Sequence, residues 1–348
     1  MKQVPYKLVL LLALIFFSCQ KEKKQLEKKE LRVIGYPYQL HPDSVNKINP
    51  LAIEEIRLYR RELDSLPDII SRFKEVKEIY LTENNFTRVP DIIRQFPKLK
   101  VLSLTDNPIK ELPDWLSEMK ELEILGVGDC EFSEFPACIL SMPWLESLVI
   151  GGNNISVIPD GIGNLTKLTY LNITDLDISD LPESIGNLRD LEYLSVTGSE
   201  NLLTLPESMA NLQKLDQLNM VNMNFTELPE VVCQLTNLKI LSLERESLLH
   251  QNHKPLKTLP ACIGNLQNLE HLYLQGCALE SLPPEIGKLK SLKTLQVESN
   301  NLRTLPPEMV TLPDDMTFYW QGNPWKTIPK ELQDVKWDQG LPRRRAFL

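Results

Sequence analysis

Three histidines are the side chains of this sequence best suited to binding a metal ion. His250 and His253 lie among about eight residues that interrupt an otherwise regular spacing, and His271 follows in the next unit. Zinc sites combine such histidines with Cys or carboxylate ligands at a firm spacing, and none accompanies these. We therefore predict no metal and no cofactor, and we interpret residues 246–258 as a solvated contact loop.

The sequence shows no arrangement of side chains that is typical of an enzyme. It has no nucleophile paired with a base, no G-x-G-x-x-G motif and no P-loop. Cysteines follow Cys19 in an odd number and without clustered spacing, so we expect them to be small core residues. They are Cys130, Cys138, Cys233, Cys262 and Cys277. We predict a protein without catalytic residues.

Tyrosine is the residue type that most suggests molecular recognition. Its ring offers a large contact area, few rotatable bonds and a polar tip, and interfaces favour it. Six of the nine tyrosines and one histidine fall at positions that we expect to face outward from strands. These predicted ligand-binding residues are Tyr59, Tyr80, Tyr170, Tyr193, His271, Tyr273 and Tyr319. They favour a protein ligand; carbohydrate could stack on the same rings, and tyrosine also simply suits strands.

A repeated unit must position these side chains. Leu-Pro-like pairs recur at intervals of 23 residues in nine of eleven cases, with one interval of 24 and one of 31. Their prolines are Pro67, Pro90, Pro113, Pro136, Pro159, Pro182, Pro206, Pro229, Pro260, Pro283, Pro306 and Pro329. The best copies, such as residues 99–113, fit L-x-x-L-x-L-x-x-N-x-L-x-x-L-P. A fixed period of this length indicates an array of stacked units.

Each unit contains one short predicted strand. In residues 102–104 the two Leu point inward and the residue between them faces solvent, because side chains alternate along a strand. The proline after the last Leu has no N–H to donate and ends the strand side of the unit. One unit buries too little apolar surface to offset the entropy of ordering 23 residues, so units must stack into a parallel ladder.

Over residues 53–329 the pattern resembles the leucine-rich repeat family, in its 23-residue, Ras-group-like form. The resemblance implies an α/β repeat solenoid of about twelve repeats, a horseshoe with a parallel concave β-sheet and short helical, 3-10 or irregular convex segments. Relatives of this type are mostly scaffolds and recognition proteins. We therefore predict a non-enzymatic protein-protein interaction module whose ligand binds the concave face.

The asparagine of the repeat is present in only some units. It is found at Asn84, Asn107, Asn153, Asn300 and Asn323. The other units have Arg61, Cys130, Leu176, Ser199, Met223, Glu246 and Cys277. In the family this side chain hydrogen-bonds the turning backbone, and Cys is a known substitute. Leu176, Met223 and Glu246 cannot do the same, so we expect the middle of the array to be looser or differently twisted.

Charge is distributed unevenly along the chain. Residues 1–52 carry a net +5 and residues 330–348 a net +2, which leaves −16 for residues 53–329 within the total of −9. Binding to phosphates depends on clustered Lys and Arg, so this distribution disfavours a nucleic-acid partner. A basic or neutral protein partner is easier to accommodate.

The chain opens with the features of a secretory leader. Residues 1–7 include two lysines, residues 8–17 are all apolar, and Ser18 precedes Cys19. Ten apolar residues span only about 15 Å as a helix, half the thickness of a bilayer core. We therefore predict a signal peptide over residues 1–18 rather than a transmembrane helix.

The end of this leader resembles the lipobox of bacterial lipoproteins, in a relaxed form like those of Bacteroidota, with Phe16 and Phe17 where Leu and a small residue are usual. The resemblance implies that Cys19 is lipidated and anchors the protein in a membrane. The charged run behind it predicts a solvated tether and resembles a surface-export signal, although such signals are usually more acidic. An ordinary secretory signal and a cytoplasmic protein with a misleading start are the alternatives.

Five segments follow from these patterns. They are the signal peptide (1–18), the lipidated Cys and tether (19–32), an N-terminal flank or cap (33–52), about twelve repeats (53–329) and a C-terminal cap and tail (330–348). Trp325 and Trp337 suit the C-terminal cap, which an open solenoid needs to cover its apolar end. We predict a lipid-anchored envelope protein at the outer membrane or cell surface; a glycan-binding or structural envelope component, or an intracellular scaffold, is the alternative.

Overall fold

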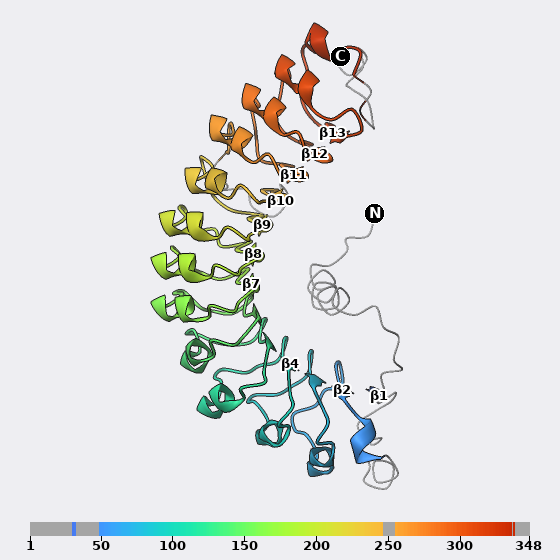
Figure 1. Ribbon diagram of the computed structural model, residues 1–348, viewed down its shortest axis with the longest axis vertical. Helices are drawn as coiled ribbons and strands as arrows, with labels where there is room; N and C mark the ends of the chain where they lie inside the picture. The colour runs from blue at the N-terminus through green and yellow to red at the C-terminus, as the bar shows by residue number, and fades with distance from the viewer. Residues whose placement is uncertain (1–29, 33–48, 246–254, 336, 338–348) are drawn as a thin grey trace.

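The computed structural model describes residues 30–32, 49–245, 255–335 and 337. Its strands form one parallel sheet in sequence order, each strand paired with the next along the chain. The sheet lines the inner side of an arc, and short helices lie along the outer side (Figure 1). The predicted solenoid with a concave parallel sheet is confirmed.

Every strand is three residues long and starts one repeat after the previous one. The strands are β1 (Glu30–Arg32), β2 (Glu55–Arg57), β3 (Glu78–Tyr80), β4 (Val101–Ser103), β5 (Ile124–Gly126), β6 (Ser147–Val149), β7 (Tyr170–Asn172), β8 (Tyr193–Ser195), β9 (Gln217–Asn219), β10 (Ile240–Ser242), β11 (His271–Tyr273), β12 (Thr294–Gln296) and β13 (Thr317–Tyr319). Leu102 pairs with Leu125, and the same register continues along the array.

The convex side consists of 3-10 helices, one of the forms that the family resemblance implied for these segments. They are η2 (Pro50–Ala52), η3 (Asp68–Arg72), η4 (Asp91–Gln95), η5 (Asp114–Glu118), η6 (Ala137–Ser141), η7 (Asp160–Asn164), η8 (Glu183–Asn187), η9 (Glu207–Asn211), η10 (Glu230–Gln234), η11 (Ala261–Asn265), η12 (Pro284–Lys288), η13 (Pro307–Thr311) and η14 (Lys330–Leu332). Among the described residues no helix is long and apolar enough to cross a bilayer.

The repeat proline begins each of these helices from η3 onward. Pro159 is extended, with φ −75°, and its carbonyl accepts the N–H of Ile162 at 3.0 Å. The carbonyl of Ile162 then accepts the N–H of Leu165 at 3.1 Å, and the chain turns back toward the sheet. Such i to i+3 bonds are seldom sustained for more than a few residues, which keeps the convex segments short.

The core lies between the sheet and the 3-10 helices and is continuous along the array. Each repeat contributes the apolar residues of its pattern, none of them more than 9% exposed in the repeat that contains β4. There they are Leu99, Leu102, Leu104, Ile109, Leu112 and Leu116. Each repeat is packed on both sides by its neighbours, so burial is shared along the stack.

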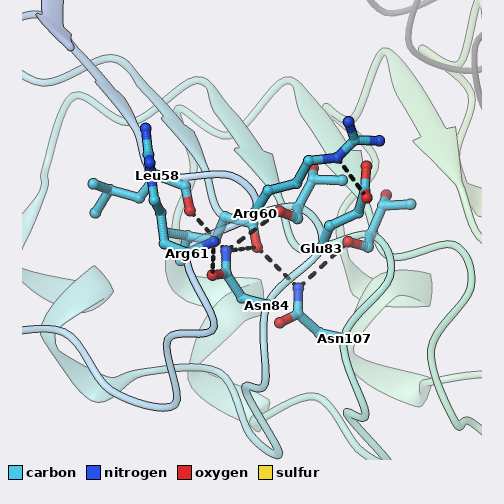
Figure 2. A network of polar contacts seen from close by, with 9 residues as sticks. Leu58, Arg60, Arg61, Glu83, Asn84 and Asn107 are labelled. Atoms are coloured by element: carbon cyan, nitrogen blue, oxygen red, sulfur yellow. Dashed lines mark hydrogen bonds and ion pairs between the residues drawn. The ribbon is translucent and has the colours of Figure 1, made fainter. Parts of the chain in front are cut away.

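Asparagines at the turn after the strand tie successive repeats together (Figure 2). Asn84 Nδ2 donates to the carbonyls of Leu58, at 2.7 Å, and Leu81, at 2.8 Å. Asn107 Nδ2 donates to the same Leu81 carbonyl, at 3.0 Å, and Asn107 Oδ1 accepts the N–H of Phe86 at 3.1 Å. Because Leu81 serves both side chains, these bonds form a ladder between repeats.

The ends of the described array differ from the predicted boundaries in one respect. β1 lies within residues 19–32, which we predicted to be tether, and pairs in parallel with β2. A strand pairs through backbone groups, so a charged sequence can extend the ladder without an apolar pattern. At the other end Trp325 and Trp337 are buried, and Trp337 packs edge-on against Phe318 with ring centroids 5.4 Å apart.

A disulfide joins two neighbouring convex helices, which corrects the prediction for two cysteines. Cys233 in η10 and Cys262 in η11 are bonded, with Cα atoms 5.6 Å apart. Stacking brings η10 and η11 together although the extra residues between them put the cysteines 29 residues apart. A count of cysteines could not reveal this pair.

The cysteines Cys130, Cys138 and Cys277 are free and buried, as predicted. Burial raises the pKa of the Cys130 and Cys277 thiols to about 12 and that of Cys138 to about 11. A thiol that stays protonated at neutral pH is a poor nucleophile and a poor metal ligand.

Candidate functional site

The concave face consists of three columns of outward side chains. In each repeat they are the first residue of the strand (column 1), its last residue (column 2) and the second residue after it (column 3). For β4 these are Val101, Ser103 and Thr105, while Leu102 and Leu104 point into the core. Parallel in-register pairing repeats each column from strand to strand, at a spacing of about 4.8 Å.

The structure places all the predicted ligand-binding rings in these columns. Tyr170, Tyr193 and His271 lie in column 1, Tyr80, Tyr273 and Tyr319 in column 2, and Tyr59 in column 3. They fall into three groups along the array, at β2–β3, β7–β8 and β11–β13. Cys19, His250 and His253 lie outside the described residues.

Tyr170 and Tyr193 stack face to face, and this corrects the prediction that Tyr170 offers its own ring to a ligand. Their ring centroids are 4.2 Å apart and their planes differ by 5°. Tyr170 is 5% exposed, and burial together with the neighbouring Tyr193 raises its pKa. Asn219 Nδ2 donates to the hydroxyl of Tyr193 at 2.9 Å. Tyr170 therefore supports the ring of Tyr193 from one side, and Tyr193 is the more accessible ring of the two.

A second aromatic group lies near the C-terminal end. His271 and Tyr273 are both on β11 and are nearly parallel, with ring centroids 6.2 Å apart. Tyr319 is in the same column as Tyr273, two strands further on. Burial, and then the carboxylate of Glu244, raise the pKa of Tyr273, so its hydroxyl stays a neutral donor.

At the N-terminal end Tyr80 is held by charged neighbours. Its hydroxyl donates to Glu78 Oε2 at 3.0 Å, and the Arg57 guanidinium lies 5.1 Å from the centre of its ring. Burial first, and the charge of Glu78 second, raise the pKa of Tyr80. Tyr59 is 51% exposed and is free to contact a ligand.

Between the first and second aromatic groups, columns 2 and 3 hold small residues, whereas column 1 holds Val101 and Ile124. The buried residues of columns 2 and 3 include Ser103, Thr105, Gly126, Gly128 and Val149, from β4 to β6. Thr82 Oγ1 lies 2.8 Å from Ser103 Oγ, whereas Thr105 Oγ1 has no hydrogen-bond partner among the described residues. None of these five residues was among the predicted ligand-binding residues. The signal that could have found them is the pair of glycines at 126 and 128, on either side of a buried Val.

A row of charged residues precedes the strands along one edge of the sheet. Ion pairs between adjacent repeats join Lys77 to Glu54 at 2.9 Å, Lys239 to Asp216 at 3.0 Å and Lys293 to Glu270 at 2.5 Å. Lys293 lowers the pKa of Glu270, mainly through this hydrogen bond. These side chains are solvent-exposed, so each pair contributes little stability.

The described residues contain no group of three His, Cys, Asp or Glu side chains that could hold a metal ion. What they arrange is a long sheet face with aromatic rings in three places. Such a surface can bind a ligand by contact, and the rings would be its main anchors.

Comparison with family models agrees with this architecture. Residues 160–259 match a leucine-rich repeat region, residues 267–307 match two copies of the leucine-rich repeat, and residues 98–119 and 144–165 each match a single repeat. A search among curated proteins finds no match.

Several solved structures share the fold. A leucine-rich-repeat protein of Leptospira interrogans is 27% identical with a TM-score of 0.71, over 87% of this chain and 81% of that one. A plant peptide hormone receptor, RGFR1 in complex with RGF2, is 25% identical with a TM-score of 0.53, over 81% of this chain. The present chain spans 50% of that receptor. An internalin of Listeria monocytogenes, 18% identical with a TM-score of 0.59 over 85% of this chain and 87% of that one, shares the fold alone.

Proposed function

We propose that this chain, a leucine-rich-repeat protein, binds a protein ligand on its concave face and acts by that binding rather than by catalysis. The observation that carries the proposal is the placement of the tyrosines: six side chains far apart in sequence share one face of one sheet. Tyrosine combines contact area with low rotational entropy, which makes it a frequent anchor of interfaces.

The relatives support a protein ligand. The plant receptor that resembles this chain is a peptide hormone receptor in complex with RGF2, and the match covers most of the array described here. The net charge of −16 over residues 53–329 favours a basic or neutral partner over an acidic one.

We also propose that the protein is exported and held at the cell envelope through a lipid on Cys19. Two observations support this. The leader has the charge and length of a signal peptide. The Cys233–Cys262 disulfide suits an oxidising compartment, because cytosolic proteins are usually kept reduced.

Site-specific cross-linking in the source cells tests the binding face. A photoreactive phenylalanine replaces Tyr193 on the concave face and, as the matched control, Val310, which is 46% exposed in η13 on the convex side. We expect a discrete protein adduct from position 193 and none from 310. Equal adducts from both positions, or adducts with polysaccharide alone, would contradict a protein ligand on the concave face.

Metabolic labelling with a fatty-acid analogue tests the anchor. The wild type should incorporate label, and Cys19→Ser should lose both the label and membrane association. Protease added to intact cells should degrade a surface-exposed array and spare a periplasmic one. An unlabelled wild type that fractionates with soluble proteins would contradict the anchor.

A further inference from the structure

One carboxylate on the concave face has no cation to balance it. Glu298 is in column 3, two residues after β12, near the C-terminal end of the arc (Figure 1). Its side chain is partly buried and makes no hydrogen bond or ion pair with any residue that the structure describes. Burial raises the pKa of Glu298, and no neighbouring cation among these residues offsets that effect. A partly desolvated carboxylate costs free energy, and an approaching cation would offset that cost.

Carboxylates near other strands of the sheet are paired with cations. On β2, Glu55 pairs with Arg57. Before β12, Lys293 pairs with Glu270. From β11 to β13, in contrast, the three columns of the concave face hold no Lys or Arg. Charge complementarity therefore favours a cation that comes from a ligand.

Two tyrosines flank the approach to this carboxylate. Tyr273 on β11 and Tyr319 on β13 are both in column 2, and the strand pairing puts Gln296 between them. At about 4.8 Å per strand their backbones are about 10 Å apart, so a cation midway lies about 5 Å from each side. A cation is attracted to the face of an aromatic ring within roughly 6 Å of its centre, so both rings can contact one cation.

Amide side chains surround the carboxylate and the rings. Gln296 lies between the two tyrosines, and Gln275 is exposed in column 3 one strand before Glu298. Their amide oxygens can accept N–H groups that one carboxylate cannot satisfy alone. A guanidinium has five N–H donors and a planar shape that stacks on rings, so arginine suits these surroundings best.

We propose that Glu298, Tyr273 and Tyr319 form an anchor site for one basic side chain of the protein ligand, best filled by arginine. The carboxylate binds the cation, and the two rings lie on either side of it. Gln275 and Gln296 accept its remaining N–H groups. This anchor site rests on the proposed function, since it assigns the chemistry of one contact on the same concave face.

A selection experiment tests the anchor site on the purified protein. The probe is a phage-displayed library of random peptides of about ten residues, and fluorescence anisotropy then gives the affinity of each selected peptide. Glu298→Gln keeps the side-chain shape and removes the charge, so it should weaken binding about tenfold. Glu308→Gln is the matched control and should leave affinity unchanged, because it removes the same charge from an exposed position on the convex helix η13.

A double-mutant cycle then assigns the contact. Replacing the basic residue of a selected peptide by Gln should weaken binding to the wild type about tenfold and to Glu298→Gln less than about twofold, because the two groups act as a pair. Tyr319→Leu removes a ring and should weaken binding about threefold, whereas Tyr319→Phe keeps the ring and should retain the affinity.

Thermal melting separates binding from folding. Removing a partly buried charge that lacks a cation should leave the melting temperature of Glu298→Gln equal to or above that of the wild type, while its affinity for the peptide falls. A general loss of structure would lower both.

The chain itself has basic residues outside the described part that could compete for the site. Gln in place of Lys254, or of Arg343, Arg344 and Arg345 together, should leave the affinity for the peptide unchanged. A gain in affinity in either variant would show that a cation of the chain itself fills the site, and it would overturn the proposal.

The remaining outcomes distinguish the anchor site from the broader proposal. Selected peptides with a Lys or Arg that is coupled to Glu298 support the anchor site. Selected peptides without a basic residue, a basic residue that acts equally on Glu298→Gln, or no selected peptide at all would overturn it. The proposed function would still stand if a protein cross-links at position 193, and it would fall if none does.

Discussion

Repeats with asparagine at the turn and those without it keep the same strand register by different means. Asn107 is buried and makes hydrogen bonds to the backbone of its own repeat and of the preceding one. Leu176 and Met223 occupy the same position, are each 2% exposed and belong to the hydrophobic core. The parallel register is unbroken from β3 through β10. The departure that we expected in the middle is therefore absent from the strand pairing.

The middle of the array has a different kind of restraint. Its last described 3-10 helix before the extra residues, η10, is joined to η11 by the Cys233–Cys262 disulfide. The asparagine repeats, by which we mean those with Asn84, Asn107 and Asn153, have no disulfide within the described residues. Local polar bonds hold one region and a covalent link holds the other, so their stabilities should respond to different changes.

The largest expected effect comes from removing the covalent link. Replacing Cys233 and Cys262 together by Ala should lower the free energy of unfolding by about 3 to 4 kcal/mol, because the link constrains 29 residues of unfolded chain. Urea denaturation measures the change, and hydrogen exchange should place it at residues 233–262. A reductant should shift the wild type and leave the double variant unaffected; a wild type indifferent to reductant would argue against the bond.

The next effect belongs to the asparagine repeats. Asn107→Ala leaves buried backbone groups of two repeats without their partner and should cost about 3 kcal/mol in unfolding free energy. Ser199→Ala is the matched change in the middle, where the buried hydroxyl has no hydrogen-bond partner within the described part of the chain, and it should change stability by less than about 0.5 kcal/mol. Equal losses in the two variants would remove the distinction between the regions.

Cys130 provides an intermediate case at the same turn position. Its thiol donates weakly to the carbonyls of Leu104, at 3.6 Å, and Gly128, at 3.5 Å. Cys130→Ala should therefore cost about 1 kcal/mol, between the values for Asn107 and Ser199. Thermal melting of the three Ala variants side by side gives the order of their losses in stability. If Cys130→Ala loses as much stability as Asn107→Ala, the interpretation of the thiol as a weak donor is contradicted.

The smallest effect is expected from the ion pairs, which both regions share. Lys100→Gln and Lys239→Gln should each cost less than about 1 kcal/mol, because both lysines are exposed. Asp216 raises the pKa of Lys239, so the contribution of this pair is present at neutral pH. This contribution to stability is lost as the pH rises above 10.5, the ordinary pKa of lysine, and through the raised pKa of Lys239 in the folded protein. Added salt should shrink both losses, and a large difference between them would show that surface charge separates the regions.

Much of the architecture could be read directly from the pattern. A strict period with L-x-L and a following proline predicts short parallel strands, a continuous core and short convex segments, and all three are present. The outward columns of the tyrosines followed from the same alternation, because a side chain next to a buried Leu on a strand must face the other way.

The details of the candidate site were less predictable. The stacking of Tyr170 on Tyr193 had a signal in their spacing of one repeat, yet its consequence, a buried Tyr170, depends on how closely two rings approach across adjacent strands. The hydroxyl of Thr105 has no hydrogen-bond partner among the residues that the structure describes, and this depends on residue 126, which belongs to the next repeat.

The sequence alone determined which side chains point into the core and which onto the concave face, because that information lies within each repeat as an alternation of apolar and polar residues. The tertiary structure decided which outward side chains cover one another, which hydroxyls find a partner, and which cysteines meet across the extra residues. Those outcomes depend on distances between neighbouring repeats, and only the stacking of the units sets them.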